Sequence, residues 1–319
     1  MGEKDKSLNI PPALIETDFQ WLGHLYRGKV RDSYKRNAQR VLIATDRLSA
    51  FDRIISSVPG KGQVLTGMAA YWFKKTEGIV ANHIIDIPDP AVMIVKEVQI
   101  VPVEVVVRGY LAGSAWRDYE SGKLVSGHRL PPGLSQFERF SAPLLTPFTK
   151  AEVGEHDLPI SEAEVLSSGL VSREHWQEIR DLALKLFEIG TIEVAKRGLL
   201  FADTKYEFGI LNGKVVLADE IHTLDSSRFW VADSYEENLS RGEPPEMLDK
   251  EPIRRWLIER GFMGEGELPE IDDNYRLTLR DHYINSASRI TGEVFNVDDS
   301  DPVDRIERNL KSFFKVNLR

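Results

Sequence analysis

The chain has 319 residues, of which 42% are apolar and 29% are charged, and this length fits one large domain or two closely joined ones. It contains no cysteine, which excludes disulfide scaffolds, thiolate zinc sites, cysteine nucleophiles and iron–sulfur clusters. A net charge of −9 disfavours nucleic acid as a partner, because phosphate neutralisation needs basic surface, but it leaves room for small anionic ligands.

The amino-terminal segment, MGEKDKSLNIPP, is charged and then proline-rich, without the apolar stretch of a signal peptide. No apolar run in the chain approaches the roughly 18–20 residues that a membrane helix needs. We therefore expect a soluble, cytoplasmic protein that does not bind a membrane.

Strand patterns dominate the first part of the chain. Residues 41–44 are expected to form a buried strand, and residues 63–75 have the spacing of a helix. β-Branched residues dominate 92–107 and predict two strands broken near Pro102. Residues 130–159 are rich in proline and glycine and are expected to be irregular.

Helical patterns dominate the last part. Apolar spacing predicts a helix within 172–198, and Ser161 with Glu164 has the spacing of a capping box. The tail from residue 249 to the end is expected to be mainly helical, most firmly over 254–260 and 304–315. This order of strands first and helices last favours an α+β fold over a regular βαβ alternation.

A basic segment near the amino terminus nearly matches a Walker A loop. Residues 23–30 fail the motif at Val30, where a magnesium-binding Ser or Thr is required, so a standard P-loop NTPase is excluded. A weaker phosphate site remains, in which Gly28 lets the backbone approach and Lys29 and Arg31 lie on one face of a strand. The alternative, a solvated basic strand, is slightly favoured by this segment alone.

Arg108 ends a strongly apolar strand and is followed by glycines. Such an arginine can clamp an anion with its planar guanidinium, but a strand that ends in water explains it equally well.

Residues 201–209 carry the most informative pattern. Strand alternation puts Asp203, Lys205 and Glu207 on one face, and Asp219 follows on the return strand of a hairpin around Asn212-Gly213. Carboxylates on neighbouring strands with a lysine between them fit Mg²⁺ and nucleotide phosphates. The alternative is a surface ladder of alternating charges, but the donors and acceptors of residues 225–228 favour a functional site.

Two registers are possible for this hairpin. A two-residue Asn212-Gly213 turn pairs Glu207 with Ala218 and puts Asp219 on the opposite face of the sheet. A three-residue loop with a G1 bulge at Gly213 instead pairs Lys205 with Asp219. Only the bulged register brings Glu207 and Asp219 to one face as diagonal neighbours, so we predict that register.

Six segments between residues 20 and 232 form a pattern that is more specific than any one motif. They are Gly28-Lys29-Val30-Arg31-Asp32, residues 45–52 (TDRLSAFD), residues 59–63 (PGKGQ), residues 103–110 (VEVVVRGY) with Gly113-Ser114, residues 149–157 (TKAEVGEHD), and residues 203–209 (DTKYEFG) with Asp219-Glu220. In this order they resemble the phosphoribosylaminoimidazole-succinocarboxamide synthase (SAICAR synthetase) family of purine biosynthesis.

The resemblance implies an ATP- and Mg²⁺-dependent ligase. Such enzymes join L-aspartate to the carboxylate of carboxyaminoimidazole ribonucleotide and release SAICAR, ADP and phosphate. The implied fold is α+β and ATP-grasp-like, with a β-rich part over residues 1–110, a larger mixed part with a helical tail over residues 111–319, and ATP in the cleft between them.

The resemblance also implies roles for individual residues. The implied ATP-binding residues are Lys29, Arg31, Lys205, Glu207 and Asp219, of which Glu207 and Asp219 would also bind magnesium. The implied residues for the ribonucleotide and the adjoining aspartate are Arg108, Ser114, Asp225, Ser227 and Arg228. The candidate catalytic residues are Lys205 and Asp203, with Asp203 as a possible general base.

Two other functions remain open. A small-molecule kinase would use the same Mg²⁺–ATP site, but a ligase releases ADP only when aspartate and the ribonucleotide are both present. A nucleotide-binding module without catalysis is disfavoured by the density of charged residues in the matching segments.

Overall fold

The computed structural model describes residues 10–51, 53–150 and 157–315, which form two compact units. The first unit comprises Met1–Met68, Ile84–Glu97 and Lys250–Arg319, and the second comprises Ala69–His83 and Val98–Asp249. These bounds differ from the single break at residue 110 that the sequence predicts, because the carboxy-terminal segment belongs to the same unit as the amino-terminal strands. Strands in the first half and helices at the end confirm the α+β prediction.

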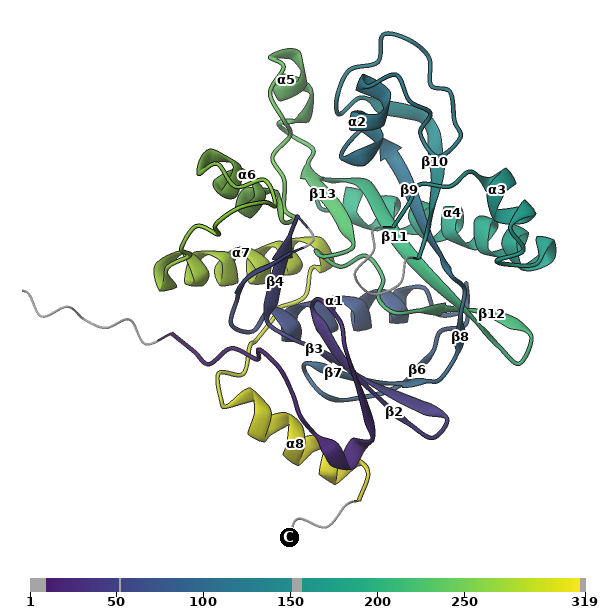
Figure 1. The fold of residues 1–319 in the computed structure, drawn as a ribbon. Helices are drawn as coiled ribbons and strands as arrows, with labels where there is room; N and C mark the ends of the chain where they lie inside the picture. The colour runs from purple at the N-terminus through teal and green to yellow at the C-terminus, as the bar shows by residue number, and fades with distance from the viewer. Residues whose placement is uncertain (1–9, 52, 151–156, 316–319) are drawn as a thin grey trace, which may run out of the picture. The chain divides into compact units, whose positions relative to one another are not determined.

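The first unit is built on an antiparallel five-stranded sheet (Figure 1). The sheet has the order β1-β2-β3-β7-β6, with strands β1 (His24–Arg27), β2 (Arg31–Arg36), β3 (Gln39–Ala44), β7 (Val92–Lys96) and β6 (Ile84–Asp89). A separate hairpin pairs β4 (Arg47–Ala50) with β5 (Arg53–Ser57). The helices of this unit are η1 (Gln20–Leu22), α6 (Glu251–Glu259), α7 (Asp273–Thr291) and α8 (Pro302–Phe313).

Helix α8 closes one core of the first unit. Its buried Ile306 and Leu310 pack in one cluster with Val41 and Ile94 of the sheet. The carboxylate of Asp89, at the end of β6, accepts hydrogen bonds from Arg305 at 3.0 Å and from Asn309 at 2.8 Å. The tail therefore returns to the amino-terminal sheet through both apolar packing and a buried ion pair.

The second unit is built on a six-stranded sheet. Strands β10 (Arg139–Thr149), β9 (Val103–Tyr110), β11 (Leu199–Leu211) and β12 (Lys214–Ala218) follow one another across the sheet, while β13 (Ser227–Val231) and β8 (Gln99–Ile100) also pair with β11. The helices are α2 (Ser114–Glu120), α3 (Glu162–Ser167), α4 (Arg173–Ala195) and α5 (Tyr235–Ser240), and α1 (Lys61–Lys75) runs from the first unit into the second.

Strand β10 lies where the sequence predicts irregular structure. The prediction for 130–159 holds for residues 130–138 and was wrong for residues 139–149, because β10 is an edge strand, and an edge strand tolerates Pro143 and Pro147 without losing a central ladder bond. Its partner β9 supplies a regular apolar strand to pair with. Residues 92–107 also contain three strands rather than two, because β8 is a separate short element.

The predicted helices are confirmed. Ser161 and Glu164 form a reciprocal capping box at α3, and α1, α4, α6 and α8 overlap the segments that the sequence singles out. No helix in the described residues is both long and apolar enough to cross a membrane.

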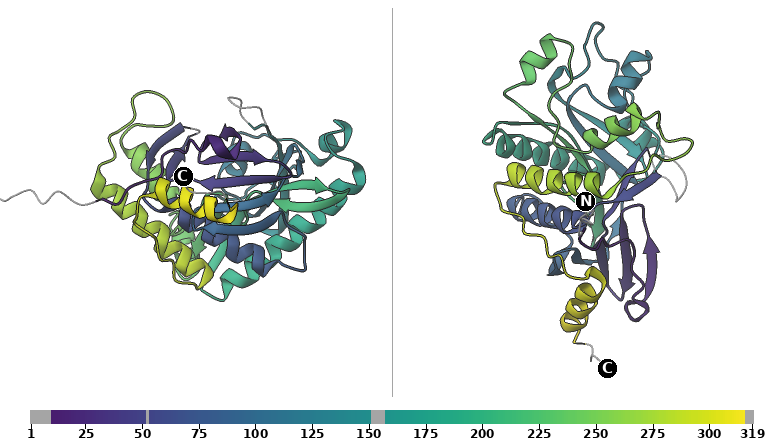
Figure 2. Two further views of the ribbon diagram at one scale, coloured as in Figure 1. Left: turned by 90° about the horizontal axis from the view of Figure 1, so that it is seen from below. Right: turned by 90° about the vertical axis from the view of Figure 1, so that its left-hand side faces the viewer.

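Helix α4 lies along one face of the second sheet, as the right-hand view of Figure 2 shows. Gly190 of this helix is buried at a close approach, because a Cβ atom there would lie 2.6 Å from the ring of Phe201 and 2.8 Å from that of His222. Both rings belong to the core beneath the helix. Only a residue without a side chain fits between α4 and this core.

We predict that Gly190→Ala destabilises the protein, although alanine is the better helix former. The added methyl group overpacks the core, which should lower the free energy of unfolding by about 1–3 kcal/mol. Urea unfolding measures the change. The control Lys185→Ala, at an exposed position of the same helix, should stay within about 0.5 kcal/mol of the parent chain. Equal stability of the two variants would contradict the prediction.

Candidate active site

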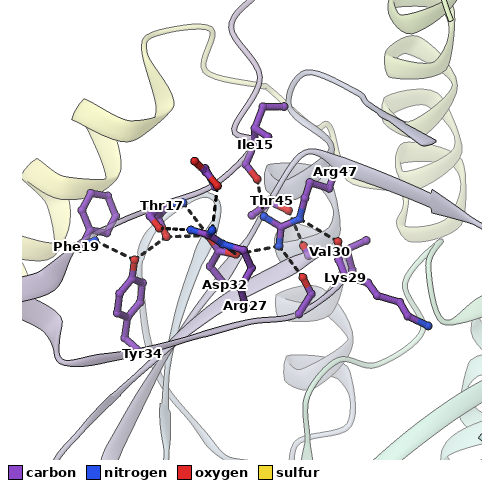
Figure 3. Close-up of polar contacts among 12 residues, drawn as sticks. Ile15, Thr17, Phe19, Arg27, Lys29, Val30, Asp32, Tyr34, Thr45 and Arg47 are labelled. Atoms are coloured by element: carbon purple, nitrogen blue, oxygen red, sulfur yellow. Dashed lines mark hydrogen bonds and ion pairs between the residues drawn. The ribbon is translucent and has the colours of Figure 1, made fainter. Parts of the chain in front are cut away.

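The basic segment of the first unit forms a turn rather than a strand. β1 ends at Arg27 and β2 begins at Arg31, so Lys29 lies in the bend between them. The prediction that Lys29 and Arg31 share one strand face was therefore wrong. Lys29 is exposed, and Figure 3 shows its side chain extending away from the guanidinium of Arg47.

Arg47 holds this turn from the protein side. Its guanidinium donates to the carbonyl oxygens of Lys29 at 2.9 Å and Gly28 at 3.0 Å. Thr45 donates from its amide and its hydroxyl to the carbonyl of Val30. Because three successive carbonyl oxygens point to buried donors, the turn keeps one shape.

A buried carboxylate fixes Arg47 in turn. Asp32, which has no exposed surface, accepts from Arg47 at 2.9 Å and from the amide of Thr17 at 2.7 Å. Tyr34 donates or accepts at the Thr17 hydroxyl and accepts from the amide of Phe19 (Figure 3). The turn with Lys29 is thus tied to the amino-terminal segment through one ion pair.

One face of the second sheet carries the other candidate residues. Asp203 pairs with Arg108 and Lys205 with Val106, so these side chains and Glu104 lie on the same face of adjacent strands. Glu207 follows on that face by alternation. The prediction that Asp203, Lys205 and Glu207 share a face is confirmed.

Arg108 is the centre of one cluster on this face. Only 4% of it is exposed, and its guanidinium donates to Asp203 at 3.1 Å, Ser114 at 3.0 Å and Thr146 at 2.9 Å. Burial lowers the pKa of Arg108, and the charge of Asp203 opposes that effect. Arg108 is therefore not a strand end in water.

Arg228 completes this cluster from β13. It donates to the same oxygen of Asp203, Oδ2, at 2.7 Å. A Cβ atom on Gly113 would lie 2.6 Å from Nη2 of Arg228, so the missing side chain lets the guanidinium approach the backbone. The structure thus brings together three of the predicted substrate-binding residues, Arg108, Ser114 and Arg228.

Of the other two predicted substrate residues, Asp225 lies in the turn before β13 and Ser227 is the first residue of that strand. The amide of Asp225 donates to the hydroxyl of Thr223 at 3.3 Å. The hydroxyl of Ser227 is buried and lies 2.8 Å from that of Thr204, so it is engaged within the protein.

Lys205 is the centre of the second cluster. Its ammonium donates to Glu104 at 2.6 Å and to Glu207 at 2.9 Å, and Lys150 also donates to Glu207. Burial alone would lower the pKa of Lys205, but the charges of Glu207, Glu104 and Asp219 outweigh it and raise that pKa well above its usual value.

The carboxylates of this cluster differ in their ionisation. Burial would raise the pKa of Glu207, but Lys205 and Lys150 hold it well below its usual range. Burial raises the pKa of Glu104, although Lys205 opposes the shift. The two ammonium groups thus favour the ionised form of Glu207.

The predicted bulged register was wrong. Glu207 pairs with Ala218 and Leu211 with Lys214, so the loop is the two-residue Asn212-Gly213 turn. Both turn residues have positive φ, 51° and 75°, which is the conformation that favours Asn-Gly in the shortest hairpin loops.

Strand alternation does not extend to Asp219. β12 ends at Ala218, and Asp219 has a left-handed backbone, with φ of 63°. Its negative charge contributes to the raised pKa of Lys205.

The donor set near Lys205 fits magnesium better than a metal with an all-protein cage. No group of three or more His, Cys, Asp or Glu in the described part of the chain could hold a metal ion. Mg²⁺ needs only one or two carboxylates, because water and substrate phosphates supply its other oxygens. Glu207 offers one such carboxylate on the face that carries Lys205.

Sequence reasoning missed Glu104, Thr146 and Lys150 as site residues. Glu104 could have been identified from the sequence, because an acidic residue within an apolar strand needs a charged or hydrogen-bonding partner when it is buried. Thr146 carried no such signal, because β10 was itself not predicted, whereas Lys150, just after β10, lies in the matching segment 149–157 but was given no role. Asp52 and residues 151–156 of the matching segments lie outside the described residues.

Comparison with known proteins identifies the family. The SAICAR synthetase family model matches residues 24–270. The chain belongs to the SAICAR synthetase family. A phosphoribosylaminoimidazole-succinocarboxamide synthase of Bacteroides thetaiotaomicron is 44% identical over 94% of this chain and 98% of its own length. A putative synthase of this name from Mesorhizobium japonicum is 46% identical over 91% and 95%.

Solved structures agree with this membership. The SAICAR synthase of Saccharomyces cerevisiae, complexed with SAICAR, has a TM-score of 0.78 and 31% identity and covers 89% of this chain and 99% of its own. A type-2 SAICAR synthetase in complex with ADP has a TM-score of 0.66 and 27% identity over 86% and 100%. The fold is that of the SAICAR synthetases.

A hydrogen bond between His222 and Tyr206 connects the loop that contains Asp219 to strand β11. Nε2 of His222 lies 2.6 Å from the hydroxyl of Tyr206, and both side chains are fully buried. Burial lowers the pKa of His222 to about 3, so the ring is neutral in the folded protein at neutral pH.

We predict that His222 contributes to acid denaturation. The unfolded chain binds a proton at this histidine below about pH 6.5, whereas the folded chain does so only near pH 3. Stability therefore falls by about 1.4 kcal/mol per pH unit between these values. In His222→Gln this contribution is absent, so urea unfolding at pH 7, 6 and 5 should show a shallower pH dependence.

The control for this prediction is Tyr206→Phe. It removes the hydrogen bond but leaves His222 buried, so stability should fall by about 1 kcal/mol while the slope with pH persists. A parent-like slope in His222→Gln would show that His222 does not carry the effect.

Proposed function

We propose that this chain joins L-aspartate to the carboxylate of carboxyaminoimidazole ribonucleotide, with cleavage of ATP to ADP and phosphate. The proposal rests on family membership over most of the chain and on the charged face of the second sheet. That face presents two guanidinium groups, two ammonium groups and three carboxylates from adjacent strands. We place the reaction in the cytoplasm, where ATP is available.

The residue types fit the chemistry of an ATP-dependent ligase. A carboxylate is a poor acyl donor because oxide is a bad leaving group. Transfer of the γ-phosphoryl group converts it to an acyl phosphate, and the aspartate amine then attacks the carbonyl carbon while phosphate leaves. Positioning and charge neutralisation dominate such a reaction, which explains lysines and arginines in place of a covalent nucleophile.

We assign the ATP phosphates to Lys29, Arg31 and Lys205, whose positive charges complement those of the phosphates. Glu207 and Asp219 would hold magnesium, which neutralises charge on the phosphates during transfer.

The Arg108 cluster is assigned to the anionic groups of the ribonucleotide, together with Ser114, Arg228, Asp225 and Ser227. One carboxylate oxygen of Asp203 accepts hydrogen bonds from both Arg108 and Arg228. This geometry favours a role in positioning the arginines over the general-base role predicted from the sequence.

We predict that ADP release requires both L-aspartate and the ribonucleotide, because the acyl phosphate is consumed only by the amine. A coupled ADP assay with each substrate omitted in turn measures this. Full turnover with the ribonucleotide alone would indicate a kinase, and turnover with neither would indicate a simple ATPase. If the chain binds ADP but turns over under no condition, it is a nucleotide-binding module without catalysis.

We predict that Arg108→Lys raises KM for the ribonucleotide at least tenfold and leaves KM for ATP little changed. Lysine cannot reproduce the planar fork that reaches Asp203, Ser114 and an anion together. Steady-state kinetics with each substrate varied measures both constants. Wild-type constants would remove Arg108 from the site, and equal losses for both substrates would point to general misfolding.

A further inference from the structure

The first unit contains a cavity of about 620 Å³ that is lined by residues without a role in the proposed reaction. Its walls come from the amino-terminal segment, β1, β5 and α7. This volume lies in the range of small-molecule sites, which are mostly apolar with a few polar groups that fix the ligand. The cavity adjoins Gly28 and Arg47, next to the turn that carries Lys29.

Three isoleucine side chains line the cavity, and two of them are about half exposed to solvent. Ile15 is 48% exposed and Ile54 is 51% exposed, and Ile271 joins them in the lining. Large apolar side chains from separate segments that stay exposed within one cavity gain free energy when an apolar group covers them.

Two arginines give the cavity a positive character. Arg276 uses three of its five N–H groups, two on Ser57 and one on Asp273 at 2.8 Å. Arg27 donates to the carbonyl of Thr17 at 2.9 Å, pairs with Glu16 at 3.0 Å and lies 3.6 Å from the Asp32 carboxylate that also pairs with Arg47.

Further N–H groups of both guanidiniums remain available to an incoming anion. The side chain of Glu16 is 64% exposed, so it can turn into solvent when an anion replaces it on Arg27. The third lining arginine, Arg47, is paired with the buried Asp32, so its charge is not available to a ligand. Asp273, the partner of Arg276, is 54% exposed and can turn into solvent as Glu16 can, so the charge available to a ligand lies on Arg27 and Arg276.

We propose that this cavity binds a small organic anion with a compact apolar body. Its phosphate or carboxylate group pairs with Arg27 and Arg276, and its body lies against Ile15, Ile54 and Ile271. Guanidinium groups recognise both kinds of anion through paired N–H donors, so the geometry defines the shared chemistry. The site is separate from the residues assigned to ATP and to the ribonucleotide, and it does not depend on that assignment.

Titration calorimetry on the full chain tests the proposal, with ADP and Mg²⁺ present at saturation to occupy the nucleotide site. The probes are phenyl phosphate and benzoate, which share a ring and differ in the anion. We expect one of them to bind once per chain, at least tenfold more tightly than phenol or inorganic phosphate alone. The tighter probe identifies the preferred anion. Absence of binding at millimolar probe, or binding that ADP abolishes, would overturn the proposal.

Paired variants locate the binding. Arg276→Gln should weaken the preferred probe at least tenfold, because a charge-assisted pair is lost. Ile54→Ser, which leaves both arginines in place, should weaken it severalfold. The matched controls lie outside the cavity: Arg254→Gln removes another arginine paired to an acidic residue three positions earlier on its helix, and Ile258→Ser removes another half-exposed isoleucine.

Both controls should bind the probe as the parent chain does. If the controls lose as much affinity for the probe as the cavity variants do, the probe binds elsewhere and the proposed site is refuted. If Arg276→Gln fails to fold, as judged by circular dichroism, the comparison of Ile54→Ser with Ile258→Ser decides the question.

Discussion

The ammonium of Lys205, held between Glu104 and Glu207 on neighbouring strands, is the interaction on which the proposed site depends. Burial of three charges is costly, and it is tolerated only while each charge keeps its partner. A shift of β11 against β9 by one residue would turn Lys205 and Glu207 together to the apolar face and leave Glu104 without its partner. The ion pairs therefore fix the register that also aligns Asp203 with Arg108.

The same ion pairs prepare the face for a charged ligand. Lys150 and Lys205 both contact Glu207, so ion pairs within the protein hold these cations and this carboxylate in place. Groups that are fixed in advance lose little freedom when phosphate and metal bind, and preorganised charge is the main source of catalysis in phosphoryl transfer. The first unit applies the same principle through Arg47, which fixes the turn of Lys29 from behind.

Strand alternation predicts the shared face of Asp203, Lys205 and Glu207 from the sequence, because a strand admits only two faces. The sequence does not reveal β10, since an edge strand with prolines resembles a loop. It also does not reveal that the tail packs on the first sheet. That contact depends on the Arg305–Asp89 ion pair, which joins residues 216 positions apart, and no local pattern encodes such a pairing.

The hairpin of β11 and β12 shows why a correct functional expectation led to a wrong register. The bulge was predicted because alternation had to bring Asp219 to the face of Glu207. In the structure, the Asn212-Gly213 turn keeps its preferred two-residue form. Strand β12 ends at Ala218, the residue before Asp219. A left-handed residue at that point frees Asp219 from the alternation of the strand.

This solution costs backbone strain, because aspartate and histidine rather than glycine adopt positive φ at 219 and 222. The buried contact of His222 with Tyr206 offsets that strain and ties the loop to β11, the strand whose other face carries Lys205 and Glu207. Because β12 ends at Ala218 and Asp219 has a left-handed backbone, the register of the hairpin does not decide which face of the sheet Asp219 takes.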